Sequence, residues 1–116
     1  QLQSKLKAKG LPWERAKAFD GSAVMGDFAS IENIDDSLSL KLAIDGEAIQ
    51  QGGVELMMYK PQQILESLKE HFTLEDGDIV MTGTPKGVGK INAGGVFHGQ
   101  INQANKTLIS SEWQAN

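Results

Sequence analysis

The sequence lacks cysteine altogether and contains only two histidines among its 116 residues. The absence of cysteine excludes disulfide bonds, thiolate metal sites and a cysteine nucleophile. The two histidines, His71 and His98, are too far apart for a motif such as H-E-x-x-H, which presents both metal ligands on one helix face. We therefore predict structural roles for both, His71 at the C-terminal end of a helix and His98 within a strand.

Long hydrophobic runs and an excess of positive charge are missing too. No stretch approaches the ~18 apolar residues that cross a membrane, and no charged and then apolar leader opens the sequence. We therefore expect a cytoplasmic protein with no membrane partner. A net charge of −4 provides no electrostatic footprint for nucleic acid, which we exclude as a partner. A content of 40% hydrophobic and 22% charged residues is typical of one globular domain.

The first ten residues predict a helix that is already under way where the sequence begins. Leu2 and Leu6 have helical spacing, and Gly10 followed by Pro12 provides a stop signal. Neither an initiator methionine nor a capping residue precedes this helix. We therefore expect residues 1–116 to be the C-terminal piece of a longer protein. The alternative is that a tag and leader were removed.

Two β-hairpins are predicted from alternation and turn chemistry. Residues 38–44 alternate apolar and polar side chains, which indicates a strand with one buried face. Asp45-Gly46 favours a type I′ turn, so residues 47–51 should return antiparallel. Residues 96–102 and 107–113 predict a second hairpin around residues 103–106.

The strongest helix prediction covers residues 60–72. Pro61 suits the first turn, and an apolar stripe follows at helical spacing, made of Ile64, Leu65, Leu68 and Phe72. With the N-terminal helix and the hairpins, the pattern predicts a mixed, mostly antiparallel β-fold with two short helices. Met57-Met58-Tyr59, just before this helix, is typical of a core or a pocket wall rather than a cofactor site.

The segment 76–90 carries the strongest chemical signal. Ile79, Val80 and Met81 predict a buried strand, which runs into a turn rich in glycine, threonine and lysine. Hydroxyl and backbone N–H groups at such a strand end can bind an anion. The turn is not a P-loop, because five residues instead of four separate Gly83 from Gly89 and no Ser or Thr follows Lys90. The dinucleotide G-x-G-x-x-G pattern and the G-x-S-x-G nucleophile elbow are also absent.

Two further groups of charged residues leave alternatives open. Lys17 lies between Trp13 and Phe19, a setting that can desolvate an ammonium and lower its pKa for proton transfer. The simpler interpretation is a surface lysine. The acidic residues of 75–78 could suggest a hard-cation site, but acidic residues are ordinary turn formers, and we favour a turn.

Four sequence blocks in order resemble the C-terminal portion of the fumarylacetoacetate hydrolase family. They are KGLPW with AKAFD (residues 9–20), LAIDGE with Gln51 (42–51), TLEDGDI (73–79) and TGTPKGVG (82–89). The similarity is greatest to the bacterial acylpyruvate hydrolases, oxaloacetate decarboxylases and the decarboxylase/isomerases of aromatic catabolism. Residues 1–116 would then be the C-terminal part of a single catalytic domain of this family.

This resemblance implies a β-roll of antiparallel sheets, usually a homodimer, that cleaves or rearranges a C–C bond next to an α-keto acid. Family members bind Mg2+ or Mn2+ through three carboxylates. By position, Lys17 would contact the metal-bound oxyanion or a catalytic water. Thr84 would hold the substrate carboxylate by its hydroxyl and amide, Gly83 would permit close approach, and Gln3 would line the pocket.

The sequence also departs from the family. The metal-binding E-x-E pair, the third aspartate ligand and the lid with the catalytic acid/base belong upstream of Gln1, so no metal ligand is expected within residues 1–116. Val54 and Leu56 replace a threonine and a polar residue. Two hypotheses follow: part of a metal-dependent hydrolase or decarboxylase that is inactive as this piece alone, or a non-catalytic structural or dimerisation domain.

Overall fold

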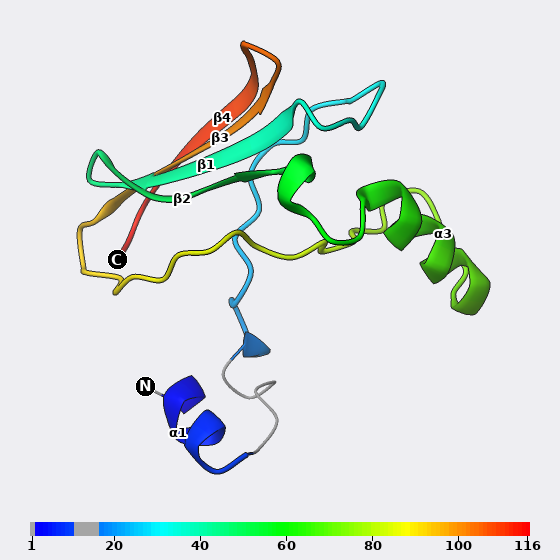
Figure 1. Ribbon diagram of the computed structural model, residues 1–116. Coiled ribbons are helices and arrows are strands. Elements are labelled where there is room, and N and C mark those ends of the chain that lie inside the picture. The colour runs from blue at the N-terminus through cyan, green and yellow to red at the C-terminus, as the bar shows by residue number, and fades with distance from the viewer. Residues whose placement is uncertain (1, 11–16) are drawn as a thin grey trace.

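The elements of the fold are arranged around one antiparallel sheet (Figure 1). The structure, a computed structural model, describes residues 2–10 and 17–116. In chain order the elements are α1 (Leu2–Ala8), β1 (Leu38–Ile44), β2 (Glu47–Gly53), the 3-10 helix η1 (Val54–Leu56), α3 (Pro61–His71), β3 (Val96–Gln103) and β4 (Lys106–Gln114). Among the described residues, no helix is long and apolar enough to cross a membrane.

The sheet has the strand order β2-β1-β3-β4, with every neighbouring pair antiparallel. Both predicted hairpins are confirmed. At the first turn, Asp45 and Gly46 have φ values of 50° and 82°, as a type I′ turn requires at both central positions. The pairing of β1 with β3 joins the two hairpins into one sheet, although more than fifty residues separate these strands in the sequence.

One face of the sheet is apolar, as the alternation in residues 38–44 predicts. Leu40 lies opposite Ile101, and Ile44 lies opposite Phe97, which in turn pairs with Trp113. The indole of Trp113 extends along this face to Gly99, where an added Cβ would come within 3.1 Å of it. Most of these side chains are only half buried in the described part of the chain, where Val54 is the one buried hydrophobic residue, 7% exposed.

Helix α3 confirms the prediction for residues 60–72 to within one residue at each end. Pro61 occupies its first turn, and the side-chain oxygen of Gln63 accepts a 2.9 Å hydrogen bond from the backbone N–H of Lys60. Ile64 and Leu68 of the predicted stripe are half buried, whereas Phe72, just beyond the helix, is 64% exposed.

The predicted buried strand at Ile79–Met81 is wrong. The structure assigns no strand to residues 73–94, and the side chains of Ile79, Val80 and Met81 are 54%, 36% and 80% exposed. A strand needs a neighbour that takes up its backbone hydrogen bonds, and among the described residues none pairs with this segment. Residues 79–91 instead run as extended chain from α3 past β2 (Figure 1).

Candidate functional site

A pocket of about 890 Å³ lies between the end of β2, η1, α3 and the segment 82–86. One side is formed by Thr82, Gly83, Thr84, Pro85 and Lys86, the turn in which the sequence concentrates its hydroxyl groups. The other side is formed by Val54, by residues 56–59 and by the face of α3 that carries Ile64 and Leu68. Met57, Met58 and Tyr59 thus line a pocket wall, in agreement with one of the two roles expected for them.

The threonine side of the pocket is open to a ligand. Thr82, Gly83 and Thr84 are all exposed while they line the pocket. Gly83 has a φ of 109°, a conformation that L-residues rarely adopt, and an added Cβ would find open space. The glycine is therefore required here by its backbone conformation, and its missing side chain leaves the neighbouring amides accessible.

The segment that carries these residues is held against strand β2. The side-chain amide of Gln50 donates to the carbonyl oxygens of Gly87, at 2.8 Å, and of Pro85, at 3.5 Å. Gly52 and Pro85 are also packed together, since a Cβ on Gly52 would lie 3.0 Å from the Cβ of Pro85. The sheet thus positions Thr84 even though Thr84 belongs to no strand.

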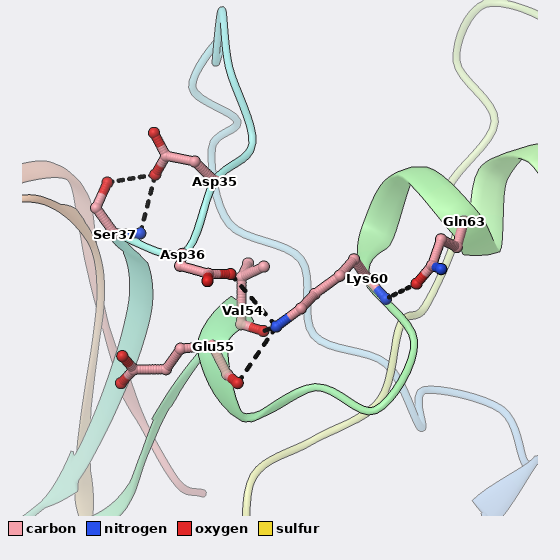
Figure 2. Close-up of polar contacts among 7 residues, drawn as sticks. All are labelled: Asp35, Asp36, Ser37, Val54, Glu55, Lys60 and Gln63. Carbon is pink, nitrogen blue, oxygen red and sulfur yellow. Dashed lines mark hydrogen bonds and ion pairs between the residues drawn. The ribbon is translucent and has the colours of Figure 1, made fainter.

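The opposite wall is fastened by Lys60, whose contacts Figure 2 shows. The Lys60 ammonium donates to the carbonyl oxygens of Val54, at 2.7 Å, and Glu55, at 3.3 Å, and forms a 3.3 Å ion pair with Asp36. Because Lys60 immediately precedes α3, these contacts tie the start of α3 to η1 and to the loop before β1. One side chain, that of Lys60, therefore links η1 to the start of α3 in this wall of the pocket.

The Asp36 loop has a local hydrogen-bond system of its own (Figure 2). The carboxylate of Asp35 accepts hydrogen bonds from the Ser37 hydroxyl and, at 2.9 Å, from the Ser37 backbone N–H. These two hydrogen bonds, the hydroxyl's first, hold the pKa of Asp35 below its ordinary value. The turn sets the entry of the chain into β1, because Ser37 directly precedes that strand.

The structure brings together only some of the predicted site residues. Gly83 and Thr84 line the pocket, whereas Gln3, in α1, and Lys17 do not. Lys17 is exposed, and Phe19 beside it is 62% exposed. Trp13, the other aromatic residue expected around Lys17, lies outside the described residues. Helix α1 lies apart from the sheet (Figure 1).

The acidic residues after α3 form a turn, as the sequence favours. The carboxylate of Asp78 accepts a 2.8 Å hydrogen bond from the backbone N–H of Glu75, and the backbone N–H of Asp78 donates to the carbonyl of Glu75 at 3.1 Å. Within residues 2–10 and 17–116, no group of three or more His, Cys, Asp or Glu side chains is placed to hold a metal ion. The described residues therefore do not fit a divalent cation.

Sequence reasoning missed Gln50 and Lys60. Gln50 and Gly87 are 37 residues apart, and neither residue type signals such a contact. Lys60 was expected only as the beginning of a helix. A weak signal was present, because a lysine directly before a helix can fold its side chain back onto carbonyl groups of the preceding turn.

Comparison with known proteins agrees with the resemblance in the sequence. Residues 1–110 match the family described as fumarylacetoacetate (FAA) hydrolase C-terminal. An oxaloacetate tautomerase of Escherichia coli (strain K12) is 40% identical over 96 residues, which cover 80% of this chain and 44% of that protein. The chain spans about half the length of the curated relatives it matches, which include mitochondrial oxaloacetate tautomerases.

Solved structures show the same relationship. A fumarylacetoacetate hydrolase family protein of yeast is similar with a TM-score of 0.83 and 32% identity, over 97% of this chain and 50% of that chain. Fumarylpyruvate hydrolase from Pseudomonas aeruginosa, in complex with Mn2+ and pyruvate, is similar with a TM-score of 0.72 and 35% identity, over 86% of this chain and 44% of that chain. The mostly antiparallel β-structure of the present chain is thus part of a larger domain, and the chain belongs to the fumarylacetoacetate hydrolase family.

Proposed function

We propose that the chain is the C-terminal part of an enzyme that breaks a C–C bond next to an α-keto acid group, either by hydrolysis or by decarboxylation. The observation that carries this proposal is the position of Thr82, Gly83 and Thr84, exposed on one side of a pocket with two hydroxyl groups and accessible amides. A carboxylate is the ligand that such donors suit best. The names of the relatives, oxaloacetate tautomerase and fumarylpyruvate hydrolase, agree with keto-acid chemistry.

In this proposal Thr84 binds the carboxylate of the keto acid through its hydroxyl and its backbone N–H. Gly83 allows the carboxylate to approach the backbone, because no Cβ stands in front of it. Lys17 is the proposed catalytic residue, whose ammonium stabilises the negative charge that develops on the enolate oxygen. Gln3 is proposed to line the same site. For Lys17 and Gln3, support comes from the resemblance of the sequence to the family alone.

A divalent cation, Mg2+ or Mn2+, belongs to the proposal for the whole protein. The Pseudomonas aeruginosa relative was solved with Mn2+. The described residues of this chain do not fit such a cation, so its ligands would come from another part of the protein. We also propose a homodimer located in the cytoplasm. The bacterial relative supports the cytoplasm, whereas the relatives named as mitochondrial support mitochondria as the alternative compartment.

The proposal is tested by titrating the chain with pyruvate, the simplest α-keto acid, and following the amide resonances by NMR. We expect the resonances of residues 82–84 to shift, and we expect Thr84→Val to weaken binding about tenfold or more, since a charged hydrogen bond contributes about 1.5 kcal/mol or more. Thr73→Val is the matched control, because Thr73 is exposed and lies outside this pocket.

Failure to bind pyruvate would contradict the proposal and favour a structural or dimerisation domain. A second measurement concerns turnover. With Mg2+ or Mn2+ present, we expect the chain alone to turn over neither acylpyruvates nor oxaloacetate, because the described residues do not fit the metal ion. Measurable turnover would show that the chain is a complete enzyme.

A further inference from the structure

Three consecutive apolar residues, Ile79, Val80 and Met81, form an extended segment whose backbone is unpaired in the described part of the chain. No backbone hydrogen bond joins these three residues to another described residue. Backbone N–H and C=O groups need partners, and water supplies them only while the segment stays exposed. The segment therefore offers a row of backbone donors and acceptors to a neighbouring strand.

The side chains of this segment are apolar on both sides of the chain. Successive side chains of extended chain point to opposite sides, so Val80 is flanked by Ile79 and Met81 on the other side. A run that is apolar on both sides is typical of a strand inside a sheet that is covered on both faces. Because the segment is exposed among the described residues, its covering must come from elsewhere.

Helix α3 continues the apolar surface of this segment. A second pocket, of about 490 Å³, lies between the two, and its apolar lining consists of Ile64, Leu68, Phe72, Leu74 and residues 79–81. In Figure 1, α3 extends beyond the end of the sheet, so the sheet leaves this surface uncovered. A contiguous apolar surface of this kind marks an interaction site.

The size of the relatives indicates what occupies this surface. The yeast family structure contains the fold of this chain in 50% of its own length, so the rest of the domain belongs to the same polypeptide. A strand within the same polypeptide has a high effective concentration. It therefore pairs in preference to a strand from a second copy of the chain.

We propose that residues 79–81 form a strand in the complete protein, paired with an apolar strand from the part of the polypeptide outside residues 1–116. The pocket between α3 and residues 72–81 receives the side chains of that strand, as strand addition combines main-chain hydrogen bonds with side-chain pockets. Because Thr82 directly follows Met81, this pairing also fixes the start of the carboxylate-binding turn. The inference rests on the proposed function only in that the chain is part of a longer enzyme.

The inference is tested by amide hydrogen exchange in residues 1–116 alone and in the complete protein. We expect the amides of residues 79–81 to exchange rapidly in residues 1–116 and about 100-fold more slowly, or slower still, in the complete protein. The amide of Asn105, in the exposed turn between β3 and β4, is the reference and should exchange rapidly in both.

Two results would overturn the inference. One is rapid exchange of residues 79–81 in both proteins. The other is protection that is already present in residues 1–116 alone, where a dependence on protein concentration would identify a second copy as the occupant. Pyruvate titration does not involve this pairing, so failure of the proposed function would be seen separately from failure of the strand.

The same substitution made in both proteins provides a second measurement. Met81→Asp should change the Tm of residues 1–116 by no more than about 3 °C, because Met81 is 80% exposed there. In the complete protein it should lower the Tm by about 8 °C or more, because the carboxylate would be buried without a partner.

Val88→Asp is the matched control for Met81→Asp. Val88 is 97% exposed and lines neither pocket, so this substitution should leave both proteins nearly unchanged. A Tm loss from Met81→Asp that is no larger in the complete protein than in residues 1–116 would overturn the inference. If the complete variant does not fold, hydrogen exchange in the two unmodified proteins decides.

Discussion

The side-chain amide of Gln50 donates a 2.8 Å hydrogen bond to the backbone carbonyl of Gly87, linking edge strand β2 to the segment that carries Thr84. Residues 73–94 contain no strand, so this segment lacks the hydrogen-bond ladder that normally fixes extended chain. One side chain from the sheet supplies part of that function. The position of the proposed carboxylate-binding residues thus depends on a residue outside the turn of residues 82–89.

Removing this link should loosen the segment. We expect Gln50→Ala to lower the free energy of unfolding by about 1 kcal/mol, since the part-buried carbonyl of Gly87 loses its donor. Urea denaturation followed by circular dichroism measures the change. Gln51→Ala is the control, because Gln51 is the exposed neighbour on the same strand. Equal losses in the two variants would contradict a specific role for Gln50.

The close approach of Gly87 to β2 allows a second test. A Cβ on Gly87 would collide with the carbonyl oxygen of Ile49, and the glycine also has a φ of 134°. We expect Gly87→Ala to lower the free energy of unfolding by about 2 kcal/mol or more, from backbone strain and overpacking together. The same denaturation experiment applies.

Gly94→Ala separates these two causes. Gly94 has a φ of 79°, but an added Cβ would find open space. Only the strain of about 1 kcal/mol is therefore expected at this position. If Gly87→Ala proved no more destabilising than Gly94→Ala, the segment would not be packed against Ile49 in solution.

Lys60 should stabilise the other wall of the pocket. We expect Lys60→Met to lower the free energy of unfolding by about 1 kcal/mol, because the carbonyl groups of Val54 and Glu55 lose a charged donor while the aliphatic stem is kept. The Lys60 side chain is 39% exposed, which limits the contribution of the Asp36 ion pair. Lys90→Met, at an exposed position, should leave stability unchanged; an equal effect there would argue against the Lys60 contacts.

The sequence predicted the parts of this fold that depend on near neighbours along the chain. Alternation and the Asp45-Gly46 turn were sufficient for the first hairpin, because the turn conformation and the pairing are both local. The apolar stripe and Pro61 were sufficient for α3. Gly83 and Thr84 were found as site residues because a compact turn motif contains both.

The remainder depends on contacts that local sequence does not encode. Ile79–Met81 has the apolar composition of a strand, but strand formation also needs a neighbour, and the described residues provide none. The Gln50–Gly87 hydrogen bond and the packing of Gly52 against Pro85 join segments more than thirty residues apart. These tertiary contacts, and not the turn motif, give the pocket its two different sides.

Asp35 should make stability depend on pH in the acid range. Hydrogen bonds from Ser37 lower the pKa of Asp35 in the folded state, so the unfolded chain takes up this proton more readily. The stabilisation is present above the unfolded pKa near 3.8 and is lost as the pH falls through that value to the folded pKa. Urea denaturation between pH 5 and pH 2 should show a weaker pH dependence in Asp35→Asn. Asp27→Asn, at an exposed position, is the control; identical curves for the wild type and Asp35→Asn would contradict the assignment.

Lys17 offers the test of the proposed chemistry in the complete protein. If its ammonium stabilises an enolate, Lys17→Ala should lower kcat by about 10²-fold or more, the usual consequence of removing one electrostatic contact to a developing charge. The loss of stability should stay within about 0.5 kcal/mol, because Lys17 is exposed in this chain. Steady-state assays with an acylpyruvate or oxaloacetate and thermal melting separate the two effects, and Lys9→Ala provides an exposed control on the same N-terminal stretch. Wild-type rates in Lys17→Ala would identify Lys17 as a surface lysine and move the search for the cationic group to another part of the protein.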